Sequence, residues 1–256
     1  MGISLEPTQR FSNRVENYRR YRPGYPSGVI DLIRVASGLG AGARVADVGS
    51  GTGIFTRQLL EAGFEVSAVE PNEAMRLAAE EDLRGYPGFH SIGASAEGTG
   101  LPDQAFCAVT SAQAFHWFKR EAVRLEFHRI LRPGGRVFLI WNGRCEKASP
   151  FDGEYQALLG TLGQSYDAVR ESVLGTKQEM ADFFSEGTFR SDYFDHEQVM
   201  TWTELRGRFL SSSYAPTEDD PGCGSVLSKL KDIFQKHESG GRVKFAMTTG
   251  VYHGRV

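Results

Sequence analysis

Short apolar runs alternate with amphipathic stretches over the first 142 residues of the chain. The apolar runs predict strands at residues 44–48, 64–69, 89–93, 105–112 and 137–141. Apolar positions spaced three and four residues apart predict helices at residues 27–36, 54–62, 72–83 and 119–131. Strands that alternate with helices in this way predict a parallel sheet with helices on both faces.

The pattern changes after residue 142. Helix-like segments at 155–162 and 178–184 are mixed with glycine and serine, and further on the pattern predicts strands at 193–202 and 241–252 and helices at 203–212 and 226–236. The beginning of the chain differs from both regions, because residues 5–26 combine arginines with tyrosines. Two prolines in Arg22–Pro26 predict an extended or turned backbone there.

A glycine-rich loop follows the first predicted strand. Asp47 lies in that strand, and Gly49, Gly51 and Gly53 alternate with other residues just before the helix that begins near Ile54. Glycine lets the backbone turn sharply and lets a ligand touch the main chain, and the helix start presents free N–H groups. The order strand, glycine loop, helix is typical of a nucleotide-type cofactor site.

The loop alone leaves the cofactor open. The third glycine comes one residue too early for a dinucleotide fingerprint, and the Gly-Lys-Ser/Thr ending of a phosphate loop is absent. Glu70 ends the second predicted strand. A carboxylate about 20 residues past such a loop stands where a ribose diol is bound.

Four motifs occur in order along the chain: Asp47–Gly53, Val69–Asn72, Ala94–Glu97 and Leu131–Arg136. This series resembles that of the class I S-adenosylmethionine (SAM)-dependent methyltransferases, from about residue 11 to residue 142. It looks most like the small-molecule branch that includes trans-aconitate and ubiquinone/menaquinone-type methyltransferases. The resemblance implies a Rossmann-like α/β fold, with a seven-stranded, mostly parallel sheet, an antiparallel last strand and a helical cap.

The resemblance also implies an organisation of the whole chain. Residues 1–26 would form an N-terminal lid segment and residues 27–144 the SAM-binding core. Residues 145–190 would form a helical cap insertion, and residues 191–256 the C-terminal part of the core with its last strands and helices. The lid and the cap would together cover the site.

The same resemblance implies which residues hold the cofactor. Asp47 would face its amino end, Glu70 its ribose, and Met75 one face of the adenine. Serine at position 95 departs from the family, which often has an acid there to accept from the adenine amino group. The complete expected set is Tyr18, Arg22, Asp47, Gly49, Ser50, Gly51, Glu70, Pro71, Met75, Ser95, Ala96, Glu97 and Gln113.

The acceptor pocket is expected at the end of the fourth strand, where Gln113 to Trp117 are polar and aromatic. His116 is the candidate general base, because its unperturbed pKa is near neutrality, and the alternative is a packing role. Methyl transfer to a carboxylate needs no base, since that nucleophile is already ionised. The expected acceptor-binding residues are Tyr21, Tyr25, His116, Trp117 and Trp141.

Amide- and adenine-directed enzymes carry an Asn-Pro-Pro-Tyr-type tetrapeptide after the fourth strand. Its absence here favours a small-molecule acceptor, with a carboxylic acid as the preferred class.

The composition of the chain restricts the classes of partner that we expect. A net charge of −3 argues against a nucleic-acid or anionic-membrane surface. No apolar run reaches transmembrane length, and three scattered cysteines indicate a reducing cytoplasm without a disulfide framework or a metal site. We therefore expect a cytoplasmic monomer or homodimer that uses SAM. Two alternatives stay open: a SAM- or S-adenosylhomocysteine-binding protein without transfer activity, and an NAD-linked oxidoreductase.

Overall fold

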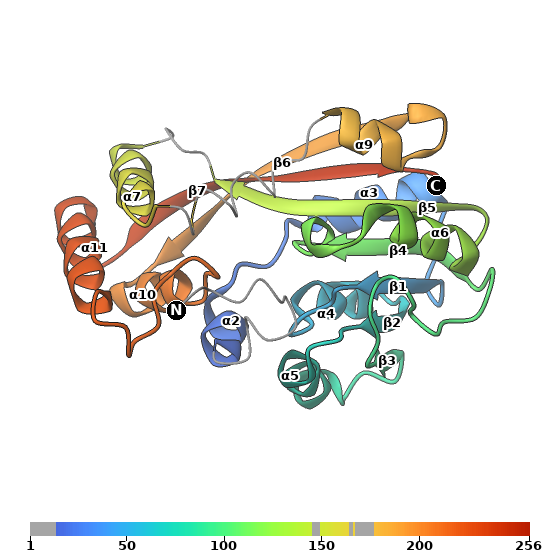
Figure 1. The fold of residues 1–256 in the computed structure, drawn as a ribbon, viewed down its shortest axis with the longest axis horizontal. Helices are drawn as coiled ribbons and strands as arrows, with labels where there is room; N and C mark the ends of the chain where they lie inside the picture. The colour runs from blue at the N-terminus through green and yellow to red at the C-terminus, as the bar shows by residue number, and fades with distance from the viewer. Residues whose placement is uncertain (1–13, 145–148, 164–165, 167–176) are drawn as a thin grey trace.

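One sheet of seven strands, in the order β3-β2-β1-β4-β5-β7-β6, runs through the computed structural model (Figure 1). The structure describes residues 14–144, 149–163, 166 and 177–256. Strands β1 to β5 are parallel, and β7 is antiparallel to both of its neighbours, β5 and β6. The predicted mostly parallel sheet with an antiparallel last strand is confirmed. The strands are β1 Arg44–Val48, β2 Glu65–Val69, β3 Phe89–Ile92, β4 Phe106–Ala112, β5 Leu131–Arg144, β6 Phe189–Met200 and β7 Val243–Gly254.

Helices cover both faces of the sheet. On one face α6 (Arg120–Ile130) and α9 (Lys177–Phe183) pack on Val137 and Leu139 of β5. On the other face α3 (Ser27–Ser37), α4 (Ile54–Glu61) and α5 (Glu73–Leu83) share a cluster with Phe138 and Ile140. Successive residues of β5 thus serve opposite faces, because side chains alternate along a strand.

A third hydrophobic cluster lies beyond the carboxyl end of β5, and we call it the cap cluster. It joins α7 (Pro150–Gly160), α10 (Trp202–Leu210) and α11 (Cys223–His237) to the first half of β7, through Phe245 and Met247. Strands β5, β6 and β7 are longer than β1 to β4 and extend toward these helices (Figure 1). The cluster therefore combines the predicted cap range with helices from 191–256.

The N-terminal segment contains a helix that the sequence pattern did not predict. This helix, α2 (Val15–Tyr21), packs against α10, and the chain is extended after it at Arg22, as the prolines require. Residues 1–13 of the predicted lid, and residues 145–148, 164–165 and 167–176 of the predicted cap, lie outside the described residues. In the part of the chain that is described, no helix is long and apolar enough to cross a membrane.

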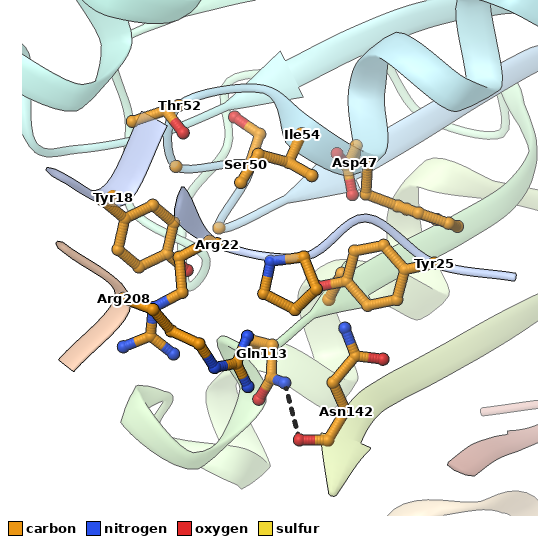
Figure 2. Close-up of a pocket in the computed structure, with 15 residues that line it drawn as sticks. Tyr18, Arg22, Tyr25, Asp47, Ser50, Thr52, Ile54, Gln113, Asn142 and Arg208 are labelled. Carbon is orange, nitrogen blue, oxygen red and sulfur yellow. Dashed lines mark hydrogen bonds between the residues drawn. The ribbon is translucent and has the colours of Figure 1, made fainter. Parts of the chain in front are cut away.

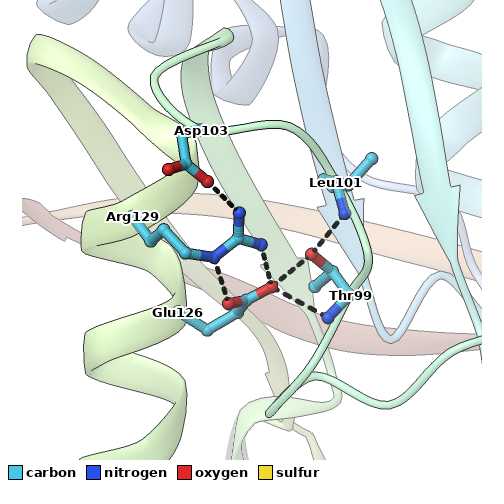
Figure 3. Close-up of polar contacts among 5 residues, drawn as sticks. All are labelled: Thr99, Leu101, Asp103, Glu126 and Arg129. Atoms are coloured by element: carbon cyan, nitrogen blue, oxygen red, sulfur yellow. Dashed lines mark hydrogen bonds and ion pairs between the residues drawn. The ribbon is translucent and has the colours of Figure 1, made fainter.

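A buried carboxylate ties the loop between β3 and β4 to α6 (Figure 3). Glu126 Oε1 accepts from the Thr99 backbone N–H at 2.8 Å and from Arg129 Nη2 at 2.7 Å, and Oε2 accepts from Arg129 Nε at 2.8 Å. Arg129 also pairs with Asp103 in the same loop. Hydrogen bonds from Arg129, then from Thr99, lower the pKa of Glu126 to about 2 against the effect of burial.

Replacing Glu126 by Gln should destabilise the fold by about 1.5–3 kcal/mol at pH 7, because Arg129 and Thr99 lose a charged acceptor. A lowered carboxyl pKa stabilises the folded state above the unfolded value and loses that effect as the pH falls from about 4.5 toward 2. Urea titrations between pH 7 and pH 2.5 measure the difference. It should shrink with acidification, and Glu121→Gln, at an exposed position of the same helix, is the control. A difference that does not depend on pH would contradict this role.

Candidate cofactor and acceptor site

The loop after β1 can be built only with glycine at two of its positions. Gly49 has φ +71°, and a Cβ there would lie 2.4 Å from Ala114 Cβ. At Gly53, with φ +79°, a Cβ would lie 2.7 Å from Leu83 Cδ1. Gly51 has φ +57°, but its added Cβ would meet nothing closer than Met75 Cε at 3.9 Å. The main chain at Gly51 is therefore bare toward open space, as a ligand-binding loop requires.

The Glu70 carboxylate fixes this loop against the start of α5. Its Oε2 accepts from the Gly51 N–H at 2.9 Å, and its Oε1 accepts from the Asn72 N–H at 2.8 Å. Burial raises the pKa of Glu70, and the two backbone hydrogen bonds oppose that shift. The carboxylate thus lies between loop and helix with one backbone partner on each oxygen.

Asp47 lies deeper, at 1% exposure. Its two oxygens accept from the hydroxyls of Thr56, at 2.7 Å, and Thr110, at 2.8 Å. Burial raises the pKa of Asp47 to about 6, although both hydrogen bonds act in the opposite direction. An ionised carboxylate in this position is incompletely compensated and would attract a positively charged group.

A cleft at the carboxyl ends of the parallel strands has two compartments, of about 570 and 550 Å³, with Tyr18, Gly49, Gly51, Ala112 and Gln113 lining both. We call the first the Glu70 compartment and the second, which Figure 2 shows, the Asp47 compartment. The Glu70 compartment is also lined by Glu70, Pro71, Met75, Ala114, Trp117 and Phe118. The Asp47 compartment is also lined by Arg22, Pro23, Tyr25, Asp47, Ser50, Thr52, Ile54, Phe55, Asn142 and Arg208.

Gln113 is held in a strained backbone conformation between the compartments. Its φ is +60°, which is uncommon for a residue other than glycine. Its N–H donates to the Ile140 carbonyl at 2.9 Å, and its Nε2 donates to the Asn142 carbonyl at 3.2 Å. Backbone strain of this kind concentrates at functional sites.

The N-terminal segment forms one wall of the Asp47 compartment. Arg22 Nε donates to Ser211 Oγ at 2.9 Å, just after α10, and its guanidinium lies 5.0 Å from the centre of the Tyr18 ring. Tyr25 packs edge-on against Phe55, and burial raises the pKa of its phenol well above the usual value. Arg22 therefore links the segment after α2 to the cap cluster while it lines the cleft.

Part of the chain that forms this cleft is similar to known proteins. Residues 46–139 match the sequence family described as Methyltransferase domain. This stretch, which runs from β1 through the glycine loop and Glu70 into β5, is thus similar to a methyltransferase domain. An uncharacterized methyltransferase of Mycobacterium tuberculosis is 37% identical over 163 residues, which are 64% of this chain and 63% of that protein. The chain thus spans 63% of this relative's length.

Solved structures of methyltransferases share the fold. A protein of Anaeromyxobacter dehalogenans assigned as a type II methyltransferase has a TM-score of 0.61 at 21% identity, over 92% of this chain and 98% of that one. Phosphoethanolamine N-methyltransferase 2 of Haemonchus contortus, in complex with phosphomonomethylethanolamine and S-adenosylhomocysteine, has a TM-score of 0.58 at 18% identity, over 98% of this chain and 59% of that one. These likenesses confirm the predicted fold.

Most of the predicted cofactor residues line the cleft. Three do not. Ser95 is exposed, Ala96 is buried in the core beneath α6, and Glu97 Oε1 accepts from the Lys119 N–H at 2.9 Å at the start of α6. The expected adenine edge therefore lines neither compartment. The residues that do line them are Tyr18, Arg22, Asp47, Gly49, Ser50, Gly51, Glu70, Pro71, Met75 and Gln113.

Two of the five predicted acceptor residues, Tyr25 and Trp117, line the cleft. His116 does not, because successive residues of the short 3₁₀ turn at 115–117 point in different directions and its ring packs on that of Trp117. Trp141 packs in the core between Phe115 and Tyr252. Tyr21 packs on α10, where a Cβ at Gly207 would lie 2.1 Å from its ring.

Three polar lining residues were missed: Thr52, Asn142 and Arg208. Asn142 follows the apolar run of β5, and the rule that ligands bind at carboxyl ends of strands, applied to Gln113, would have found it. Arg208 is only 9% exposed and belongs to α10, where Leu205 and Phe209 are also buried. A charged residue among the apolar positions of a predicted helix was the available signal.

Replacing Asp47 by Asn tests the charge at the base of the cleft. A carboxyl pKa raised from 3.8 to about 6 makes ionised Asp47 a cost to folding that is absent below pH 3.8 and complete above pH 6. Asp47→Asn should therefore gain stability relative to the wild type as the pH rises from 4 to 7, by on the order of 2–3 kcal/mol. Thermal unfolding at several pH values measures it, with Asp31→Asn, at an exposed site on α3, as control. Parallel pH profiles of variant and wild type would refute the assignment.

Proposed function

We propose that the protein is a SAM-dependent methyltransferase that transfers a methyl group to a small-molecule acceptor. The observation that carries this proposal is the Glu70 carboxylate, which bridges a bare glycine loop and a helix start inside the stretch that is similar to a methyltransferase domain. The Haemonchus contortus neighbour binds S-adenosylhomocysteine, the product that SAM leaves after methyl transfer. A cofactor of this kind fits here, because the loop offers main chain without side chains and two acids of different depth.

The two compartments suggest a division of the cofactor between them. The Glu70 compartment, with Met75, Pro71 and Trp117, would hold the adenosine part, and Glu70 would accept from the ribose hydroxyls. The Asp47 compartment would hold the methionine part, with Asp47 near its ammonium group. When bound, SAM supplies an electrophilic methyl group on a sulfonium. The roles of Ser95, Ala96 and Glu97 at the adenine stay predictions.

The residues of the cleft would position the acceptor and exclude water. Tyr18, Tyr25 and Trp117 supply aromatic walls, and Gln113 and Asn142 supply polar groups at the ends of β4 and β5. Among the residues that the structure describes, neither compartment is lined by a histidine. An acceptor that is ionised before it reacts fits this lining best, so we keep a carboxylic acid as the acceptor class.

The finer affiliation that we propose rests on the motif resemblance of the sequence. We place the chain with the small-molecule branch that resembles the trans-aconitate and ubiquinone/menaquinone-type methyltransferases, and we place its activity in the cytoplasm. No nucleic acid or membrane partner is proposed, in keeping with the net charge of −3.

Truncation of Glu70 tests the cofactor site. Glu70→Ala should weaken SAM binding by about 1.5–3 kcal/mol, because ribose hydroxyls and the Gly51 N–H lose a charged acceptor. Calorimetric titration with SAM measures this loss. Glu73→Ala, at an exposed position in the first turn of α5, should bind SAM like the wild type. Unchanged SAM affinity in a folded Glu70→Ala protein would exclude the ribose assignment.

Turnover separates the proposed enzyme from its alternatives. Wild-type protein, methyl-labelled SAM and a panel of di- and tricarboxylic acids should yield labelled methyl esters, which release methanol in mild base. Binding of SAM without transfer to any component of a metabolite extract would instead support a non-catalytic binding protein. Binding of NADH in place of SAM would support an oxidoreductase.

A further inference from the structure

Three arginines from distant parts of the chain meet at the boundary between the cleft and the cap cluster. Arg22 follows α2, Arg144 ends β5, and Arg208 belongs to α10. Arg208 and Arg22 line the Asp47 compartment, and Arg208 lies across the cavity from Asp47 (Figure 2). The charges of Arg22 and Arg144 both act on Arg208, which places the three guanidinium groups in one electrostatic cluster.

The contacts of Arg208 leave its charge uncompensated. Its Nη1 donates to Gln198 Oε1 at 2.6 Å, its Nη2 lies 3.3 Å from Met247 Sδ, and its guanidinium lies 4.6 Å from the centre of the Phe245 ring. All of these partners are neutral. Burial, with the charge of Arg22, lowers the pKa of Arg208 to about 10, so it remains a cation at neutral pH.

Arg144 is similar, because its hydrogen-bond partners among the described residues are phenols. Its Nη1 donates to the Tyr214 hydroxyl at 2.8 Å and its Nη2 to the Tyr166 hydroxyl at 2.9 Å. Burial favours the neutral phenol of Tyr214, yet the charges of Arg144 and Arg22 outweigh it and lower the pKa of that phenol. The surroundings of these arginines thus favour negative charge.

Several other arginines of the chain are paired with acids. Arg19 contacts Glu81 and Asp82, and Arg129 contacts Glu126 and Asp103. Within the described residues, by contrast, no Asp or Glu forms an ion pair with Arg22, Arg144 or Arg208. A buried cation without a counter-ion costs free energy, since water no longer solvates it. Charged groups left in this state beside a cleft indicate a functional site.

We propose that Arg208, flanked by Arg22 and supported by Arg144, binds an anionic group of the methyl acceptor, either a carboxylate or a phosphate. The planar guanidinium of Arg208 offers parallel N–H donors that match both anions. The anion supplies the negative charge that the cluster lacks. That the anion belongs to a methyl acceptor rests on the proposed function. The anion site itself rests on the arginine cluster alone.

Binding measurements on the full-length protein test this site. The protein is saturated with S-adenosylhomocysteine and titrated with succinate, citrate and inorganic phosphate, and with succinamide as a neutral analogue of succinate. We expect at least one of the three anions to bind and succinamide not to bind. Arg208→Gln should weaken anion binding at least tenfold and change the affinity for S-adenosylhomocysteine less than twofold. Arg206→Gln removes a half-buried arginine of α10 that pairs with Glu218, and it should leave both affinities unchanged.

Three outcomes would overturn the inference: no anion binds the wild type, Arg208→Gln binds the anion as tightly as the wild type, or Arg208→Gln loses affinity for S-adenosylhomocysteine instead. The last result would assign Arg208 to the cofactor. Should Arg208→Gln fail to fold, Arg208→Lys keeps the charge without the planar fork, and the anion should raise its melting temperature less than that of the wild type. If the wild type does not bind S-adenosylhomocysteine but still binds the anion, the proposed function fails while the anion site stands.

Discussion

One carboxylate joins the glycine loop after β1 to the start of α5. Glu70 accepts the N–H of Gly51 through one oxygen and the N–H of Asn72 through the other, so the loop after β1 and the start of α5 cannot move independently. Because both bonds join parts of the protein to each other, folding itself orders this part of the site. The Gly49 turn, which fits only without a side chain beside Ala114, holds the loop from its other end.

The strands of the sheet could be predicted from the sequence, because the patterns that indicate them lie within short stretches of the chain. Apolar runs and glycine spacing predict β1, the loop and Glu70 without knowledge of any distant contact. Side-chain direction at the edges of the cleft was harder. Trp141 was expected in the pocket and Asn142 was overlooked, and the two are neighbours on β5 that face opposite sides of the sheet. Tyr21 was expected to face a ligand, but its ring fills the space left by Gly207, a contact that spans most of the chain.

The cap cluster shows why the acceptor side could not be predicted in the same way. Its helices come from both sides of β6 in the sequence. The arginines at its boundary with the cleft, Arg22, Arg144 and Arg208, are separated by more than a hundred residues at one step and by more than sixty at the next. No periodicity links such positions. Only the long strands β5, β6 and β7 bring them together, since they project past the shorter strands and give α7, α10 and α11 a surface to pack on (Figure 1).

The pairing of β5 with β7 therefore determines the positions of cleft and arginine side chains as well as the stability of the sheet. Asn142 lies opposite Thr249, whose hydroxyl donates to Asn142 Oδ1 at 2.5 Å, and Arg144 lies opposite Met247, which contacts Arg208. A slip of one residue between these strands would exchange the faces of Trp141 and Asn142 and move Arg144 relative to Arg208. Selection should therefore remove single-residue insertions and deletions within this strand pair. Exposed loops of the same protein can vary in length more freely.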